Sequence, residues 1–383
     1  MEREKKEKEA DKKEHLNNRR LSKKNGNKSD KRILIWTGTG IAAVFLIVGI
    51  AWLILSMIGE KNMLAAEKKA EQDVNETDTE PRAAVSQDTL RYTELTSLDD
   101  FGKEKWNEGI LKYKDKYYRY NERLQNYLFM GIDNDEPAAP ADNSLEGGQS
   151  DAMFLLVLDE AAEKMKIIAI NRNTMVPVDV YDEDGNFMLQ MELQICTAHG
   201  YGDGMKLSCM RTVEAVDRLF RDIPISGYLA LNMGGLPALN DAIGGIRLTP
   251  IESIDWRDAG IKEGEEITLN GKQAYAYVRY RDINEFATAD QRLKRQEQYI
   301  DALINKLHTD PSLAGKMINE SAEYIVASID LPKIANSAGN MSFSDDDKYS
   351  VPGETELKDG YERYNIDREA MIELILDVFY EQV

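Results

Sequence analysis

Residues 127–133 read Tyr-Leu-Phe-Met-Gly-Ile-Asp, an apolar run that is closed by a glycine, an isoleucine and an aspartate. Two more apolar runs follow at residues 153–158 and 166–170, and a polar loop and then a short charged turn separate the three. Short apolar runs bounded by turn residues predict buried strands. Because no helical segment separates the runs, we expect an antiparallel meander.

The meander predicts where polar side chains gather. The end of its first strand, the start of its second and the end of its third lie at one edge of the sheet. Asp133, Asp151 and Arg172 stand at these three positions. We therefore expect them to converge in space, although other segments separate them along the chain.

The rest of the chain alternates between helical and extended patterns. Apolar residues recur at helical spacing over residues 206–220, 236–243, 290–307 and 368–380, and residues 225–231 read as a further strand. Mixed elements of this kind predict an α/β fold. We expect a layered α-β-α domain with a central mixed, partly antiparallel sheet.

Four arginines stand close together near the start of the helical segment 290–307. Arg279, Arg281, Arg292 and Arg295 fall within seventeen residues of a chain that has 48 basic and 68 acidic residues. Guanidinium groups bind phosphate oxygens in pairs, so the cluster indicates a phosphate site. The alternative is a solvated helix face paired with carboxylates.

The helical period places these arginines only in part. On the helix from Asp290, Arg292 and Gln296 share one face, and Arg295 lies beside them. Arg279 and Arg281 share a face only if their segment is extended, and we expect this because the loop-like residues 282–285 follow.

The N-terminal part predicts a membrane anchor. Residues 33–58 contain no charged side chain, and twenty-six helical residues span roughly 39 Å, which exceeds a ~30 Å hydrocarbon core. Residues 1–32 carry a net charge of +6, so the whole-chain charge of −20 leaves about −26 for the rest. The positive-inside rule then predicts a cytoplasmic arm and an extracytoplasmic main part.

Beyond this predicted single transmembrane helix, composition divides the chain further. Residues 59–120 are predicted to form a helical stub, a flexible stalk and an accessory segment, and residues 121–383 the main folded domain. We therefore expect a protein of the cell membrane with a single transmembrane span. The basic arm has no aromatic residue to stack on bases, so nucleic-acid binding is not expected.

Cysteine and histidine usage excludes some classes of protein. Cys196 and Cys209 are the only cysteines, which excludes a disulfide scaffold and leaves one bridge or two thiols open. The three histidines are far apart, so they do not make a zinc site, and His199 is expected to be structural or exposed.

The chain resembles the LytR–CpsA–Psr family of bacterial envelope proteins over about residues 125–310. Each matching stretch is weak by itself, but five of them in this order, behind one predicted anchor, are specific. They are Leu128-Phe-Met-Gly-Ile-Asp133, Ser150-Asp-Ala-Met-Phe, Ile168-Ala-Ile-Asn-Arg-Asn-Thr174, Asn240-Asp-Ala-Ile-Gly-Gly-Ile246 and Leu269-Asn-Gly-Lys-Gln-Ala-Tyr-Ala-Tyr-Val-Arg-Tyr-Arg281, with Arg292 and Arg295-Gln296 following.

The resemblance implies a phosphotransferase. Its expected substrates are a glycopolymer on an undecaprenyl pyrophosphate lipid and a peptidoglycan hydroxyl, and its expected cofactor is Mg²⁺. By position, Asp133 and Asp151 match carboxylates near the metal. The implied catalytic residues are Asp133, Asp151, Arg172 and Arg281, and the implied pyrophosphate-binding residues are Arg172, Arg279, Arg281, Arg292, Arg295 and Gln296.

The chain also departs from the family pattern. The usual Pro-Arg-Asp is Asn171-Arg172-Asn173 here, and Gln194 takes the place of a lysine. One negative and one positive charge are lost, so the changes can offset each other. Two alternative functions stay open: a non-catalytic envelope regulator that binds polyprenyl phosphates or wall glycans, and a polyprenyl pyrophosphatase.

Overall fold

A computed structural model describes residues 92–103, 109–141, 146–281, 288–339 and 341–383 of the chain. The predicted cytoplasmic arm at 1–32 and the predicted transmembrane helix at 33–58 lie outside these residues. Among the described residues, no helix is both long and apolar enough to cross a membrane.

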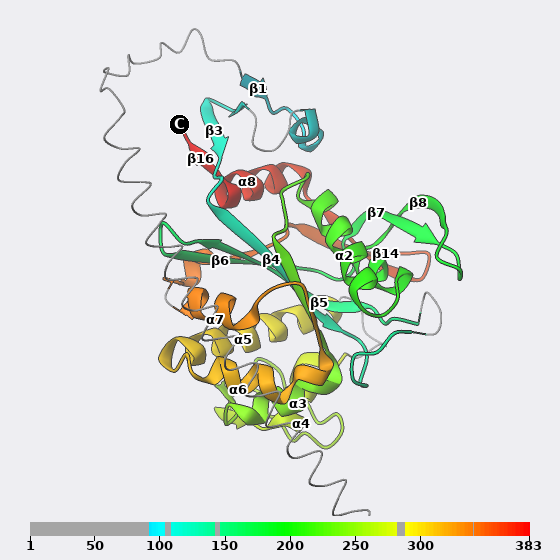
Figure 1. Ribbon diagram of the computed structural model, residues 1–383, viewed down its shortest axis with the longest axis vertical. Coiled ribbons are helices and arrows are strands. Elements are labelled where there is room, and N and C mark those ends of the chain that lie inside the picture. Colours follow the sequence, from blue (N-terminus) through cyan, green and yellow to red (C-terminus); the bar gives the residue numbers. More distant parts are fainter. Residues whose placement is uncertain (1–91, 104–108, 142–145, 282–287, 340) are drawn as a thin grey trace, which may run out of the picture. The chain divides into compact units, whose positions relative to one another are not determined.

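A six-stranded mixed sheet forms the centre of the fold (Figure 1). The three predicted strands are confirmed as an antiparallel meander, and strands β4 and β6 each gain a parallel neighbour, β9 and β13. The order across the sheet is β12-β9-β4-β5-β6-β13. Its strands are β4 (Leu124–Ile132), β5 (Ser150–Asp159), β6 (Lys164–Ile170), β9 (Gly227–Asn232), β12 (Ile325–Ala327) and β13 (Lys348–Ser350).

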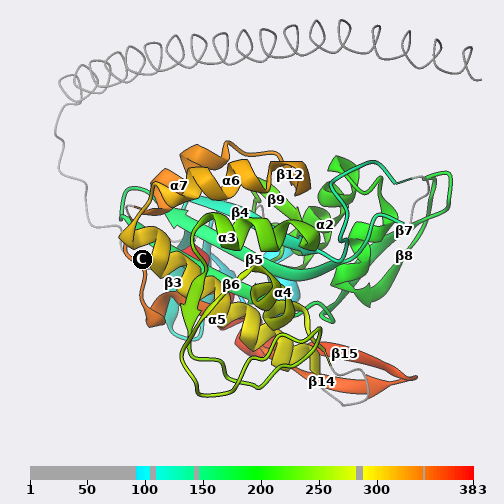
Figure 2. The same ribbon diagram turned by 90° about the horizontal axis from the view of Figure 1, so that it is seen from below.

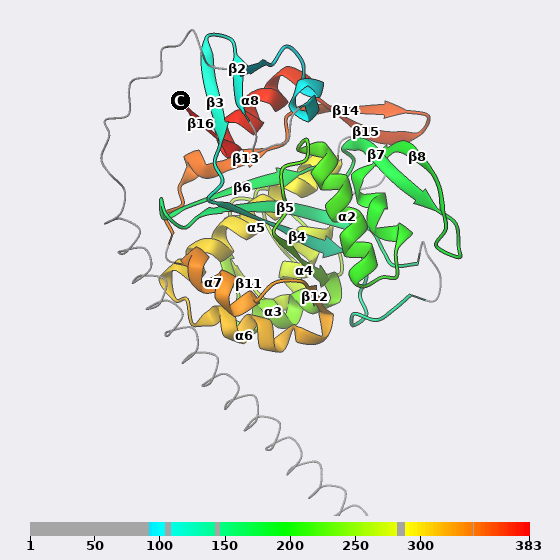
Figure 3. The same cartoon turned by 45° about the horizontal axis from the view of Figure 1, so that its top comes forward.

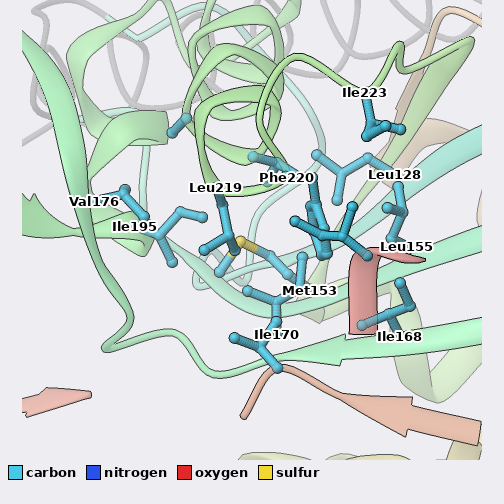
Figure 4. Packing of buried hydrophobic residues seen from close by; sticks show 14 of the residues in the cluster. Leu128, Met153, Leu155, Ile168, Ile170, Val176, Ile195, Leu219, Phe220 and Ile223 are labelled. Atoms are coloured by element: carbon cyan, nitrogen blue, oxygen red, sulfur yellow. The ribbon is translucent and has the colours of Figure 1, made fainter. Parts of the chain in front are cut away.

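One face of this sheet packs against helices α2 (Lys206–Leu219) and α8 (Arg368–Phe379). Side chains alternate along a strand, so Leu128, Met130 and Ile132 of β4 point to this layer. Figure 4 shows Leu128 and Met153 packed with Leu219 and Phe220. This apolar cluster is the largest part of the core.

A second group of helices covers the opposite face (Figures 1 and 2). Phe129, Phe154 and Ile167 point from the sheet toward them. Helices therefore lie on both sides of a mixed sheet, which confirms the expected layered architecture. The helices are α3 (Leu236–Ala242), α4 (Gly271–Arg279), α5 (Thr288–Thr309), α6 (Leu313–Glu320) and α7 (Leu331–Gly339).

Local sequence explains where two of these helices start and stop. Asn270 and Gln273 form a capping box that begins α4, since each side chain bonds the backbone N–H of the other residue. After α3 the chain turns at Gly244 and Gly245, whose φ values of 77° and 79° are accessible mainly to glycine.

Three short strands before β4 join the C-terminus in a smaller sheet. Strands β1 (Tyr92–Glu94), β2 (Ile110–Tyr113) and β3 (Lys116–Tyr120) are completed by β16 (Tyr380–Gln382). Leu98 and Phe101, on the 3-10 helix η2 (Leu98–Lys103), are buried in the same core cluster as α8. This segment is therefore part of the compact unit that the described residues form.

Two hairpins lie at the same end of the central sheet (Figures 2 and 3). The first is β7–β8 (Met175–Tyr181 and Phe187–Gln194), and the second is β14–β15 (Gly353–Lys358 and Tyr361–Ile366). A backbone bridge joins Thr174 to Tyr364, so the second hairpin is attached to the chain just after β6. A two-stranded sheet, β10 (Ile246–Leu248) with β11 (Ile267–Leu269), completes the fold.

Candidate active site

Asp151 lies between two arginines at the sheet edge that the meander predicts. Its Oδ1 accepts from Nη1 of Arg172, and its Oδ2 accepts from Nη1 of Arg292 at 2.9 Å. The three side chains are only 10%, 15% and 6% exposed, so this is a buried ion-pair triad. Residues of β5, α5 and the segment after β6 therefore meet at one point.

Arg279 brings a second carboxylate pair into the same region. Its guanidinium bonds Asp133, and its Nη1 lies 2.7 Å from Oδ1 of Asp135. The hydroxyl of Tyr275 donates to the same oxygen of Asp135 at 2.6 Å. Burial disfavours the charged form of Arg172, yet acidic neighbours, Asp151 and Asp133 among them, raise the pKa of Arg172. Asp133 is thus within electrostatic range of Arg172, as the sequence predicted.

Arg281 joins the cluster from another direction. Its Nε donates to Thr288 Oγ1 at 3.0 Å, and its Nη2 donates to Glu362 Oε2 at 2.7 Å. Burial lowers the pKa of Arg292, and the positive charges of Arg172 and Arg281 act in the same direction. Arg292 is therefore close enough to Arg172 and to Arg281 to be repelled by both, and an anionic ligand would relieve this repulsion.

Arg279 and Arg281 do not share one extended face, so that expectation is wrong. Helix α4 continues through Arg279, and only Tyr280 after it is extended, with φ −51° and ψ 135°. The capping box and the buried apolar residues of α4 favour a helix. The loop-like residues come only after both arginines, so they do not end the helix before Arg279. The two guanidiniums consequently bind different carboxylates.

Arg295 and Gln296 support the site from behind. Arg295 is 1% exposed; its Nε donates to the carbonyl of Tyr277 at 2.8 Å, and its other nitrogens bond the carbonyl of Tyr280 and Glu252. Gln296 Nε2 donates to the carbonyl of Val278 at 3.1 Å. These bonds satisfy carbonyls at and just after the C-terminus of α4, which have no partner within the helix.

The structure therefore gives Arg295 contacts unlike those of the other four arginines. All three nitrogens of its guanidinium bond protein groups, the carbonyls of Tyr277 and Tyr280 and the carboxylate of Glu252. Helical spacing alone does not separate Arg292 from Arg295, because both lie near the buried side of α5.

The sequence-based prediction of the site did not include two of its carboxylates. Asp135 stands two residues after Asp133, so an extended reading of that loop could have included it. Glu362 comes from β15, more than a hundred residues from Arg172 in the chain, and no motif marks it. Its carboxylate is 8% exposed and bonds both Arg281 and Asn173.

The two departures from the family pattern are in contact with each other. Gln194 Nε2 donates to Asn173 Oδ1 at 3.1 Å and also to the carbonyl of Glu362 at 2.6 Å. An amide pair therefore stands at the two positions where the family pattern has opposite charges.

Neither cysteine is in a disulfide, and both thiols are buried. Cys196 Sγ accepts from Nη2 of Arg172 at 3.2 Å, so this thiol helps to fix the guanidinium. His199 is 1% exposed, its Nδ1 lies 3.2 Å from the carbonyl of Gly148, and burial lowers the pKa of His199 to about 4. It is a neutral structural histidine.

An apolar cavity of about 300 Å³ adjoins the charged cluster. It lies between the central sheet and the helices of the second layer, with Phe154, Leu156 and Leu303 among its lining residues. The residues that line it toward the cluster lie within one helical turn of the charged groups along the chain. They are Gly131, Ala152, Val278 and Gln296, which adjoin Asp133, Asp151, Arg279 and Arg292 in strand, helix or turn.

The donor set fits a magnesium ion only together with a ligand. The described residues contain no group of three or more His, Cys, Asp or Glu side chains that could hold a metal by themselves. Mg²⁺ commonly takes one or two carboxylates and fills its remaining positions with water and substrate phosphates. Asp133 and Asp151 supply such a pair of hard oxygen donors.

The described residues thus form an α/β fold with a cluster of arginines and carboxylates beside an apolar cavity. A sequence profile of the LytR_cpsA_psr family matches residues 92–376, and the chain belongs to this family. The membership predicted from the five motifs is thereby confirmed.

Curated relatives are named as transferases. The chain is 26% identical to the polyisoprenyl-teichoic acid–peptidoglycan teichoic acid transferase TagU of Oceanobacillus iheyensis over 67% of this chain and 72% of that protein. It is also 26% identical to TagU of Halalkalibacterium halodurans, over 53% of this chain and 60% of that protein. A further relative at 26% identity is biofilm regulatory protein A of Streptococcus mutans, matched over 57% of this chain and 55% of that protein.

Solved structures share the fold. The crystal structure of Bacillus subtilis TagV aligns with a TM-score of 0.52 at 22% identity, over 67% of this chain and 96% of that one. A Streptococcus agalactiae protein aligns with a TM-score of 0.54 at 21% identity, over 67% of this chain and 86% of that one. These likenesses confirm the mixed α/β architecture.

Proposed function

We propose that this protein transfers a glycopolymer from a polyprenyl pyrophosphate carrier to a peptidoglycan hydroxyl, with undecaprenyl as the carrier lipid. The observation that carries the proposal is the gathering of Arg172, Arg279, Arg281 and Arg292 beside an apolar cavity. The names of the curated relatives support the same reaction class.

The site suits both ends of such a lipid. A pyrophosphate diester carries two negative charges, and guanidiniums bind its oxygens with directed hydrogen bonds. The prenyl chain is apolar, and the cavity between the sheet and α5 is lined almost wholly by apolar side chains. Transfer of the chain from water to such a surface is favourable. We assign the head group to the arginines and the first prenyl units to the cavity.

The charge balance of the cluster favours exchange of partners. Each of the four arginines has a carboxylate partner in the free protein, and the partners are Asp133, Asp135, Asp151 and Glu362. Four positive and four negative groups make a neutral site. These carboxylates keep the arginines oriented before the ligand arrives. An incoming dianion then competes with them for the guanidiniums.

Asp133 and Asp151 are the residues that would hold Mg²⁺ in this account. The chemistry that the ion supplies when bound is neutralisation of phosphate charge, in a site whose arginines do the same. With a cation near Asp133 and Asp151, Arg172 and Arg292 would be freer to turn toward phosphate oxygens.

The transfer step itself is an in-line displacement. The acceptor oxygen attacks the phosphorus that bears the glycan, a new P–O bond forms, and the bond to the bridging pyrophosphate oxygen breaks. The electron pair leaves on the prenyl monophosphate, whose growing charge the guanidiniums stabilise. We assign the acceptor proton to Asp133, whose side chain is 41% exposed, since Asp151 is 10% exposed and bonds two arginines.

The proposed location follows from the reaction and from the predicted anchor. A lipid carrier lies in a membrane and peptidoglycan lies outside it, so the described residues would work on the extracytoplasmic side. The uncharged segment 33–58 would hold the chain there as a single-pass protein with a cytoplasmic N-terminus.

A regulatory function is the second candidate, because one relative is named a biofilm regulatory protein. The test uses the full-length chain with Mg²⁺ and an undecaprenyl pyrophosphate-linked glycan, with and without peptidoglycan, and measures undecaprenyl monophosphate. We expect release only with the acceptor, together with a phosphodiester-linked product. Release independent of acceptor indicates a pyrophosphatase, and binding without release indicates a regulator; either result contradicts the transferase.

A further inference from the structure

We propose that Glu362 is a positioning residue of the candidate site, which orients Arg281 and sets the charge available to the head group. The inference rests on the proposed function and names a residue that no motif of the sequence indicates. Glu362 Oε2 accepts from Arg281 Nη2 at 2.7 Å and from Asn173 Nδ2 at 3.0 Å. One carboxylate thus joins a head-group arginine to the residue that follows Arg172.

The backbone fixes where this carboxylate stands. The N–H of Tyr364 donates to the carbonyl of Asn173 at 2.9 Å, so β15 is bonded to the chain directly after Arg172. On the other strand of the hairpin, Thr355 Oγ1 donates to Asp290 Oδ2 at 2.8 Å, and Asp290 also accepts from Asn171. The hairpin is therefore attached both to the segment of Arg172 and to the start of α5. These attachments fix the position of Glu362 relative to the arginines.

The carboxylate of Glu362 favours a neutral residue at position 173. Gln194 Nε2 donates to Asn173 Oδ1 at 3.1 Å, which leaves Asn173 Nδ2 to face Glu362. An aspartate at position 173 would place two carboxylates about 3 Å apart beside one guanidinium. Like charges at that separation cannot both be ionised without a large penalty. The site therefore accommodates one carboxylate at either residue, 173 or 362.

Removal of the Glu362 charge should act on binding and on transfer in opposite directions. The carboxylate offsets the positive charge of Arg281, so its loss strengthens attraction for a pyrophosphate. The same carboxylate holds Arg281 in one orientation, so its loss weakens the alignment that transfer requires. Partial unfolding lowers activity but does not tighten binding, so the opposed effects separate positioning from mere support of the fold.

The experiment uses the full-length chain with three variants: Glu362→Gln, Asn173→Asp and the double variant. Farnesyl pyrophosphate with Mg²⁺ is the binding probe, measured by calorimetry, and kcat is measured in the transfer assay. We expect Glu362→Gln to bind the probe about threefold more tightly and to transfer about tenfold more slowly. Asn173→Asp should bind at least about tenfold more weakly, and the double variant should return to within about threefold of the wild type.

A matched control exists on the same hairpin. Asn365 Nδ2 donates to Glu356 Oε2 at 3.0 Å, the same pairing at the same distance, but both side chains are exposed. Asn365→Asp should leave probe binding and kcat unchanged. Were Asn173→Asp too unstable to purify, Glu362→Gln alone still decides, since weaker or equal binding contradicts the inference.

The outcomes also separate this inference from the proposed function. A wild-type chain that binds the probe, with variants that bind equally well and show no rescue in the double variant, overturns the role of Glu362 alone. A wild-type chain that does not bind the probe overturns the proposed function and the role of Glu362 with it.

Discussion

Arg292 and Asp151 form a buried ion pair, 2.9 Å from Nη1 to Oδ2, that joins the start of α5 to the start of β5. The second oxygen of Asp151 bonds Arg172. One carboxylate thus holds two head-group arginines from distant parts of the chain. The geometry of the site and the packing of the second helical layer therefore depend on the same contact.

Asp151→Asn tests this contact. A buried ion pair that loses one charge leaves the other uncompensated, at a cost of about 3–5 kcal/mol. We expect a clear drop in the free energy of unfolding by denaturant, and a loss of transfer of at least about a hundredfold. A variant with wild-type stability and wild-type kcat would contradict the role of Asp151 in holding the two arginines.

Arg295 and Arg281 should respond in opposite ways to substitution. Arg295 is 1% exposed and bonds carbonyls next to the C-terminus of α4, whereas the Arg281 side chain is 27% exposed and faces the cluster. We expect Arg295→Met to lower the free energy of unfolding by several kcal/mol. Arg281→Ala should keep most of its stability and lose transfer by at least about a hundredfold.

Thermal and chemical denaturation together with the transfer assay compare the two. Arg247→Ala is the control, because the Arg247 side chain is 70% exposed and pairs with Glu266 at the surface. Such a pair is worth under about 1 kcal/mol, so neither quantity should change much. A stable, inactive Arg295→Met protein would return Arg295 to the head-group site.

The fold was predicted well because its signals are local. Apolar runs gave the three meander strands, and helical spacing gave α2 and α8 within a residue or two of their observed ends. The convergence of Asp151 and Arg172 followed from the direction of those strands alone. Each inference needed only periodicity, turn residues and one rule of connection.

The remaining parts of the site depend on contacts that periodicity does not contain. Glu362 reaches Arg281 because a C-terminal hairpin bonds the chain after β6, and no local pattern indicates that pairing. Arg292 and Arg295 are both buried on α5, and only the position of α4 decides which faces the cluster. The cavity escaped prediction because its lining residues resemble any other core residues.

The cavity assignment is tested by filling it. Leu303 of α5 lines the cavity, so Leu303→Trp should place an indole where we put the prenyl chain. We expect KM for the undecaprenyl substrate to rise about tenfold or more, as the burial of several methylene groups is lost. KM for an isopentenyl analogue should change little. Equal KM values in the variant and the wild type for both chain lengths would place the lipid elsewhere.

His199 gives the protein an acid-sensitive step. Burial lowers the pKa of His199 to about 4, against about 6.5 in an unfolded chain. Below about pH 6.5 the His199 side chain is protonated in the unfolded state but not in the folded state. The free energy of unfolding therefore falls as pH falls from about 6.5 to about 4. The loss amounts to about 3 kcal/mol over that window.

His199→Gln should remove this part of the pH dependence. We expect the difference in unfolding free energy between pH 7 and pH 4.5 to be smaller in the variant than in the wild type. Chemical denaturation at four or five pH values measures it. Parallel curves for the two proteins would mean that folding does not shift the pKa of His199.

The most direct test of the whole account is a structure of this protein with a bound polyprenyl pyrophosphate. We predict that the phosphate oxygens contact Arg172, Arg279, Arg281 and Arg292, with the first prenyl units between the sheet and α5. A pyrophosphate bound away from these arginines, or a prenyl chain outside the cavity, would contradict the account.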